Sequence, residues 1–158
     1  MQKIIVPLLI SKLNNATASP RRRKNYNFHQ STDANYQRML NCLMPDTYCR
    51  PHKHTDPVRS ETFIILKGKA LVVEFGDAGM IIDSIVLDSE KGNFRVDLLP
   101  DYWHTIIAIT PCVVFEAKEG PYIPLKETDF APWAPAEGTV EAPKYNTELK
   151  YKLGLQNE

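Results

Sequence analysis

Short runs of apolar and β-branched residues alternate with polar turn signals from about residue 36 to residue 118. The turns are rich in Gly, Pro, Asp and Ser. Several short strands separated by such turns at regular spacing are typical of an all-β sandwich or barrel. The predicted strands are 37–44, 47–52, 61–66, 70–75, 81–87, 93–98, 104–109 and 112–117. No helical patterns alternate with them, which argues against a parallel α/β sheet.

The chain on the amino-terminal side of this region has a different pattern. Residues 3–6 are predicted as a short strand and residues 7–18 as an amphipathic helix, because Pro7 suits a first helical turn and Leu9 and Leu13 share a face. A basic run follows, and then an aromatic segment that ends at His29.

These patterns predict one domain in three parts. An N-terminal strand, helix and basic segment occupy 1–35 and pack on the barrel. The barrel itself spans 36–118, and an irregular, proline-rich tail over 119–158 packs back on it. The last residues of the tail form a short helix or fray. Residues 31–44 fit a helix face as well as a strand.

Composition narrows the class of protein. The 158 residues hold 19 Lys plus Arg and 19 Asp plus Glu, and this balance argues against general electrostatic binding to nucleic acid or membranes. Three cysteines without close spacing suit a reducing compartment, so we expect a cytoplasmic protein without disulfides. Pro7 interrupts the apolar run near the N-terminus, and we therefore expect no cleaved signal peptide.

The candidate chemistry lies in the histidines. His52 and His54 are two residues apart, so on an extended segment both imidazoles leave the same face. His104 opens a later predicted strand, and Glu61 opens the strand that follows the His-Lys-His segment. An isolated His-x-His is more often a solvated surface pair. Three imidazoles and one carboxylate on neighbouring strands of a barrel, however, would hold one divalent transition metal such as Zn, Fe, Ni or Mn.

These residues resemble the two metal motifs of cupins, and more narrowly the WbuC family of cupin-fold metalloproteins. The resemblance covers about 19–138. The stretches that carry it are Ser19-Pro20-Arg21-Arg22-Arg23-Lys24-Asn25-Tyr26-Asn27-Phe28-His29, Arg38-Met39-Leu40-Asn41, Pro45-Asp46-Thr47-Tyr48-Cys49-Arg50-Pro51-His52-Lys53-His54, Glu61, Gly68, Gly92, Pro100, Trp103-His104-Thr105, Lys118-Glu119-Gly120-Pro121-Tyr122 and Asp129-Phe130-Ala131-Pro132-Trp133-Ala134-Pro135.

The resemblance implies a double-stranded β-helix, the jelly-roll barrel of cupins, with a bound metal and often a link to surface-polysaccharide biosynthesis. It does not imply a settled reaction. The chain departs from the general cupin pattern in three places. The loop 55–60 is longer than usual, Asp101 stands where the second motif usually has Gly, and Ala108 stands where that motif often ends in Asn.

Four further residues are candidates for binding a ligand near the metal: Arg50, His29, Tyr48 and Tyr102. Arg50 is the candidate partner for a carboxylate, sugar acid or phosphorylated sugar that places another oxygen on the metal. The simpler interpretations are a surface ion pair for Arg50 with Asp101 or Glu119, and an ordinary hydrogen-bonded imidazole for His29.

Three interpretations of function follow, and no catalytic residue is assigned. The first is a metal-dependent isomerase, epimerase or lyase acting on a small anionic or sugar-derived substrate, and an Fe-dependent dioxygenase is the second. The third is a non-catalytic cupin that binds a small ligand at the metal. We expect no nucleic-acid or membrane partner, and a homodimer is left open.

Overall fold

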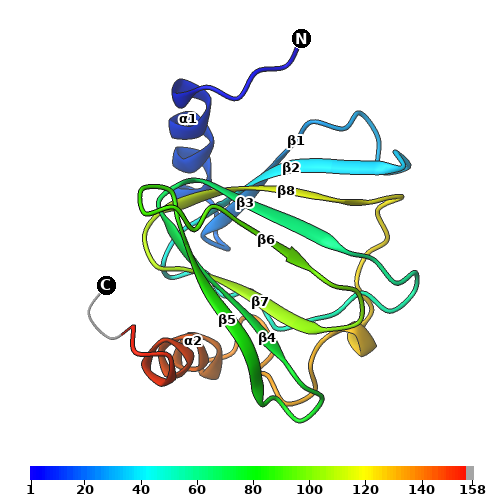
Figure 1. The fold of residues 1–158 in the computed structure, drawn as a ribbon, viewed down its shortest axis with the longest axis vertical. Helices are drawn as coiled ribbons and strands as arrows, with labels where there is room; N and C mark the ends of the chain where they lie inside the picture. The colour runs from blue at the N-terminus through cyan, green and yellow to red at the C-terminus, as the bar shows by residue number, and fades with distance from the viewer. Residues whose placement is uncertain (156–158) are drawn as a thin grey trace.

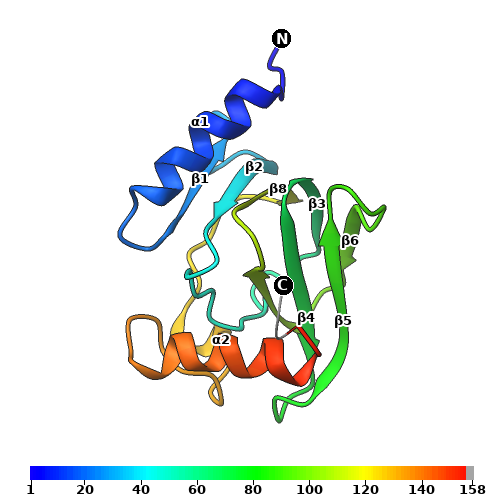
Figure 2. The ribbon, with the colours of Figure 1, turned by 90° about the vertical axis from the view of Figure 1, so that its left-hand side faces the viewer.

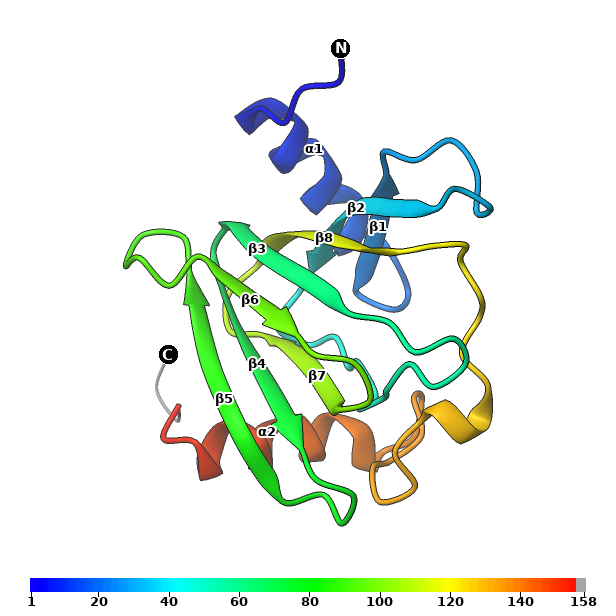
Figure 3. The same ribbon diagram turned by 45° about the vertical axis from the view of Figure 1, so that its right-hand side comes forward.

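A computed structural model describes residues 1–155, and its centre is a pair of facing antiparallel β-sheets (Figures 1 and 3). The larger sheet has the strand order β1-β2-β8-β3-β6, and the smaller sheet has the order β5-β4-β7. The strands are β1 (Arg23–Asn27), β2 (Tyr36–Leu43), β3 (Glu61–Lys67), β4 (Lys69–Phe75), β5 (Ile81–Asp88), β6 (Arg95–Leu98), β7 (Trp103–Ala108) and β8 (Cys112–Glu119).

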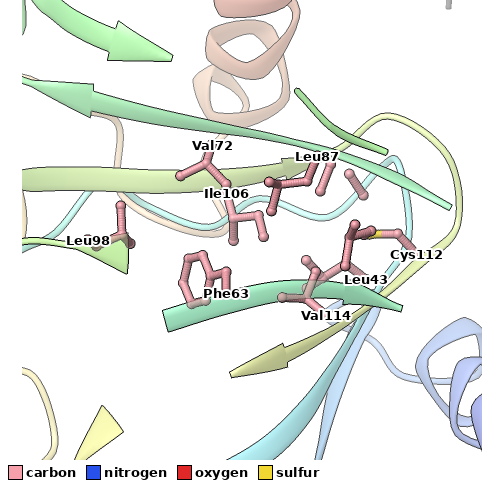
Figure 4. Packing of buried hydrophobic residues seen from close by; sticks show 11 residues of the cluster. Leu43, Phe63, Val72, Leu87, Leu98, Ile106, Cys112 and Val114 are labelled. Carbon is pink, nitrogen blue, oxygen red and sulfur yellow. The ribbon is translucent and has the colours of Figure 1, made fainter. Parts of the chain in front are cut away.

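The main core fills the space between the sheets (Figure 4). Successive side chains of a strand face opposite sides, so β4 sends Ala70 and Val72 into this core, whereas Leu71 and Val73 face away from it. On the larger sheet, Phe63 of β3 enters the same core. Strands that bury both faces require covering elements on the outside.

Two helices and the tail supply that cover on opposite sides of the molecule (Figure 2). Helix α1 (Val6–Thr17) packs Leu9 and Ala16 on the outer face of the larger sheet. The chain after β8 covers the outer face of the smaller sheet through the buried residues of its irregular part and of helix α2 (Glu141–Lys152). A short 3₁₀ helix, η1 (Glu127–Asp129), precedes α2.

The strands predicted within the barrel are confirmed with small shifts at their ends, except for 47–52, which forms no strand. The helix predicted over 7–18 is present one residue earlier, but residues 3–6 are not a strand. The helical alternative for 31–44 is wrong, because β2 occupies most of that segment. The tail is irregular up to residue 140, and α2 is longer than the short terminal helix expected from the sequence.

Strand β1 was not predicted, because its sequence has no alternation of apolar and polar residues. It joins the sheet by antiparallel pairing with β2, in which Arg23 lies opposite Leu43 and Asn27 lies opposite Met39. Its burial is only partial. Backbone pairing at the edge of the sheet therefore forms this strand, rather than a hydrophobic face.

Candidate metal centre

The space between the sheets is apolar at one end and polar at the other. Along β8 the inward-facing residues are Cys112 and Val114, followed by Glu116 and Lys118, since alternate residues share a face. Strand β3 runs antiparallel to β8 and places Glu61 directly opposite Lys118. The two sheets therefore enclose a group of buried charged side chains at one end of the barrel.

The structure brings the four predicted metal ligands together at this polar end. One ligand atom from each of His52, His54, Glu61 and His104 lies within 4.8 Å of the others. The ring centroids of His52 and His104 are 4.5 Å apart, and those of His54 and His104 are 5.8 Å apart. These four residues form a group that could hold a single metal ion, and the identity of the metal is not determined by the geometry.

His52 is positioned by backbone hydrogen bonds although its segment is not a regular strand. The backbone N–H of His52 donates to the carbonyl of His104 at 3.0 Å, and the N–H of His104 donates back at 2.9 Å. The two residues that carry these imidazoles therefore lie directly opposite each other in the backbone pairing. This pairing places the His-Lys-His segment beside β7, in effect as the next strand of the smaller sheet.

The tail supports the other edge of the same segment. The backbone N–H of Lys53 donates to the carbonyl of Asp129 at 2.9 Å, and the N–H of Ala131 donates to the carbonyl of Pro51 at the same distance. Phe130 thereby bridges His52 on the side away from His104. The tail thus helps to build the site as well as to cover the sheet, which the sequence pattern alone did not show.

Backbone carbonyls determine which nitrogen of two imidazoles carries hydrogen. Nδ1 of His52 lies 3.0 Å from the carbonyl oxygen of Arg50, and Nδ1 of His104 lies 3.0 Å from that of Tyr102. A carbonyl oxygen can only accept, so Nδ1 is the donor in both rings. In a neutral ring Nε2 is then left with a free lone pair, the arrangement that a metal-binding histidine requires.

The carboxylate of Glu61 lies close to the Nε2 atoms of two of the imidazoles. Nε2 of His54 lies 2.8 Å from Oε1 of Glu61, and Nε2 of His104 lies 3.3 Å from Oε2. Both ring nitrogens are buried, and neither completes a well-aligned hydrogen bond with any of residues 1–155. In a neutral His104 ring the Nε2 lone pair faces the carboxylate, and this contact is repulsive unless a proton or a cation lies between the two atoms. The donor set therefore fits a divalent cation.

Burial and neighbouring charges set the protonation of the group. Burial, together with the nearby His104 and His54, lowers the pKa of His52 to about 3, which keeps that ring neutral. Burial opposes protonation of His104, but Glu61 outweighs it and raises the pKa. Burial alone would raise the pKa of Glu61, yet His104, His54 and Lys118 outweigh it and hold the pKa well below its usual range. Glu61 is therefore an anion, whose charge favours a protonated imidazole or a metal ion beside it.

Lys118, Glu116 and Asn41 extend this group, and sequence reasoning missed all three. Nζ of Lys118 lies 2.9 Å from Oε1 of Glu61 and 2.8 Å from Oε1 of Glu116. Nδ2 of Asn41 donates to Glu116 from the neighbouring strand. The available signal was the spacing of Glu116 and Lys118, which continues the inward-facing alternation of Cys112 along the same strand. These residues place a buried counter-ion behind the predicted metal ligand.

Arg50 is engaged by other partners in the structure. Its Nη1 lies 2.7 Å from Oε1 of Glu127, and its guanidinium lies 5.1 Å from the centre of the Phe130 ring. Asp101 and Glu119 were the partners predicted for a simple ion pair with Arg50. The partner is Glu127, whereas Asp101 pairs with Lys53 at 2.9 Å. A ligand-binding role for Arg50 stays a prediction.

The other candidate ligand-binding residues have ordinary structural contacts. His29 lies 3.1 Å through Nδ1 from both the backbone oxygen and the backbone nitrogen of Arg38. The hydroxyl of Tyr48 is buried and donates to the carbonyl of Pro135. Tyr102 is exposed, and its carbonyl holds His104. These contacts do not test whether the three side chains bind a ligand, and that role stays a prediction for each of them.

Asp101 and the three cysteines behave as their sequence context indicated. Asp101 adopts the left-handed conformation expected where the cupin pattern usually has Gly, with φ of 67°. Cys42, Cys49 and Cys112 are all free thiols.

None of the helices within residues 1–155 is long and apolar enough to cross a membrane.

One family model matches the first half of the chain, from α1 into β5. The model of the family described as Domain of unknown function (DUF6016) matches residues 6–87, which is more than half of the chain. The chain belongs to this family. No curated protein matches it.

Solved structures with the same fold are distant in sequence. KdgF from Halomonas sp. is 13% identical, with a TM-score of 0.50, and the match covers 66% of this chain and 84% of KdgF. The capsular polysaccharide assembling protein CapF from Staphylococcus aureus is 16% identical, with a TM-score of 0.50, and the match covers 72% of this chain. An RmlC-like cupin protein from Desulfovibrio desulfuricans is 17% identical over 64% of this chain and 84% of its own, with a TM-score of 0.46.

The chain spans about 29% of the CapF chain, so the likeness concerns one part of that protein. Together, the two facing antiparallel sheets and the matches to KdgF and CapF confirm the predicted all-β, jelly-roll fold of cupins. At these identities the likeness shows the fold and not the activity.

Proposed function

We propose that this protein is a metal-binding cupin in which His52, His54, Glu61 and His104 bind one divalent transition metal, and that it acts on a small anionic or sugar-derived ligand at that metal. The candidate metals are Zn, Fe, Ni and Mn. The WbuC family, suggested by the sequence motifs, is the finer assignment that we propose within the cupins. The activity that follows is a metal-dependent isomerisation, epimerisation or lyase reaction in sugar or polysaccharide metabolism.

One observation carries the proposal. Two imidazoles have Nδ1 occupied by a backbone carbonyl, and Nε2 of His104 faces the buried carboxylate of Glu61 without completing a hydrogen bond. Lys118 already pairs with Glu61, but the unpaired buried ring nitrogens remain costly unless a proton or a cation satisfies them. A metal ion bound by these atoms removes that cost, whereas a purely structural polar cluster would be expected to complete its own hydrogen bonds.

A metal held in this way supplies a Lewis acid that polarises an oxygen of the ligand. The residues of the chain then have separate tasks. His52 and His104 are fixed in orientation by their carbonyl partners, and Glu61 offsets part of the positive charge. Lys118 and the residues behind it hold Glu61 in place. The context of polysaccharide metabolism rests on the family resemblance, since the match to CapF concerns the fold.

Metal content tests the proposal directly. The purified protein would be stripped with a chelator, reloaded separately with Zn²⁺, Mn²⁺, Ni²⁺ and Fe²⁺, desalted and measured by elemental analysis. We expect one ion per chain for at least one metal, and loss of that ion in His104→Ala. We expect Glu61→Gln to weaken binding at least about ten-fold, because the carboxylate charge is lost.

His29→Ala is the matched control, because it removes an imidazole outside the predicted ligand group that is hydrogen-bonded to the backbone of Arg38. We expect this variant to keep the full metal content. Equal metal content in the wild type and in His104→Ala would contradict the proposal. Turnover of sugar acids or phosphorylated sugars that depends on the metal would distinguish an enzyme from a protein that only binds its ligand.

A further inference from the structure

Arg59 lies in the loop between two of the predicted metal ligands, His54 and Glu61. It is only 6% exposed. Its Nε and Nη2 are buried and have no hydrogen-bond partner, and the guanidinium makes no ion pair within the described part of the chain. An arginine is charged under all ordinary conditions. Arg59 is therefore a buried positive charge without a counter-ion.

The two free nitrogens form one edge of the guanidinium, and this edge fits an oxyanion. Arg21 shows the same arrangement in use: its Nε and Nη2 donate to the two carboxylate oxygens of Glu137 at 2.8 and 2.7 Å. Paired donors of this kind match the geometry of carboxylate and phosphate. The free edge of Arg59 is therefore suited to a carboxylate or a phosphate.

Arg59 and His54 line the same small hollow, whose volume of about 10 Å³ has room for one water molecule. Two acidic residues also line it, but both have other partners. Asp129 accepts hydrogen bonds from Thr55 at 2.6 Å and from the backbone N–H of Lys126 at 2.7 Å. Asp56 pairs with Nζ of Lys126 at 3.2 Å. The hollow is thus lined by the imidazole of a predicted metal ligand and by an arginine whose charge neither Asp56 nor Asp129 neutralises.

Arg50, the arginine singled out from the sequence, differs in this respect. It already has Glu127 as an ionic partner. A ligand anion would have to compete with that carboxylate for Arg50, whereas it would meet no competitor at Arg59. Burial makes the difference larger, because an unpaired charge in a protein interior is costly and a pairing anion removes that cost.

We propose that Arg59 is the anion-binding residue of the site. It holds a carboxylate or phosphate group of the ligand through Nε and Nη2, while another oxygen of the same ligand reaches the metal held by His52, His54, Glu61 and His104. This inference rests on the proposed metal site and adds the chemical class of the ligand. Because the free edge of Arg59 is covered, residues 55–60 must shift to admit the anion.

The test is titration of the metal-loaded protein with inorganic phosphate and with citrate, followed by calorimetry, with glycerol as a neutral probe. We expect at least one anion to bind and glycerol not to bind. Arg59→Met should lower the affinity for the anion about ten- to hundred-fold, because a paired, charge-assisted contact is lost. Arg95→Met is the matched control, because Arg95 is exposed and pairs with Asp97. It should change anion affinity less than about two-fold.

Two further measurements make each outcome decisive. Metal content is measured on the same samples, and one ion per chain in Arg59→Met together with unchanged anion affinity would overturn this inference while leaving the metal site intact. Failure of the wild type to bind metal would overturn the proposed function instead. Thermal unfolding without any anion should show Arg59→Met at least as stable as the wild type, because the substitution removes an unpaired buried charge. A clear fall in its midpoint would show that Arg59 has a structural partner, and would also overturn the inference.

Discussion

Lys118 provides a sharp test of the buried charge network, because it neutralises two carboxylates at once. Its side chain is 13% exposed, and those of Glu61 and Glu116 are 3% and 7% exposed. Burial would lower the pKa of Lys118, but the two carboxylates outweigh it and raise the pKa, so the ammonium is charged. In Lys118→Met the side chain keeps much of its volume, and the two anions lose their common partner.

Removing one partner of a buried ion pair costs about 3–5 kcal/mol, because the remaining charge is left without compensation. Glu116 keeps Asn41, and Glu61 keeps its neighbouring imidazoles. We therefore expect the lower end, about 3 kcal/mol. For a chain of this length that loss corresponds to a fall of about 6–12 °C in the unfolding midpoint.

The assay is urea unfolding and thermal unfolding in the presence of a chelator, which separates the network from bound metal. Lys144→Met is the matched control, since Lys144 is exposed on α2, and it should change stability by less than about 0.5 kcal/mol. Adding Glu116→Gln to Lys118→Met should cost less than the sum of the two single changes. A loss below about 1 kcal/mol in Lys118→Met, or strict additivity, would refute the reasoning.

Two further predictions concern pH. Protons compete with the metal for the imidazoles, and Glu61 raises the pKa of His104 against the effect of burial. Metal affinity, measured by titration, should therefore begin to fall at a higher pH than it would for an unperturbed histidine, and should keep falling as the pH drops. An affinity that is constant from pH 8 to pH 5 would be inconsistent with these ligands. Burial would raise the pKa of Glu137, but Arg21 and Arg23 outweigh it and lower the pKa to about 2. Its contribution to stability is therefore complete above its usual value of 4.5 and disappears as the pH falls toward 2. Because the side chain is 36% exposed, Glu137→Gln should cost less than about 1 kcal/mol at pH 7 and little at pH 2, as measured by unfolding at both values.

The candidate metal-ligand group could be predicted from the sequence because its placement depends on local rules. His52 and His54 share a face in any extended segment, and Glu61 and His104 open strands whose alternation continues into apolar core residues. The prediction of a strand over 47–52 was wrong, yet the i and i+2 spacing still brought both rings to one place. Two backbone hydrogen bonds to His104 hold the segment extended.

The residues around this group could not be predicted because long-range pairing positions them. Lys118 meets Glu61 only through the register of β8 against β3, and Phe130 reaches His52 only because the tail returns to the barrel. Arg59 reads as a surface charge in the sequence, because a polar loop of this kind gives no sign of its burial. Each of these contacts joins segments whose relative placement no local pattern encodes.

X-ray absorption spectroscopy at the edge of the bound metal reports the metal's ligands directly. We expect a first shell of nitrogen and oxygen ligands at about 2.0–2.2 Å, with the outer-shell scattering of three imidazoles. In His52→Ala the imidazole contribution should fall by one ring or the metal should be lost. A first shell that contains sulfur, or one that contains only oxygen and is unchanged in His52→Ala, would contradict the account.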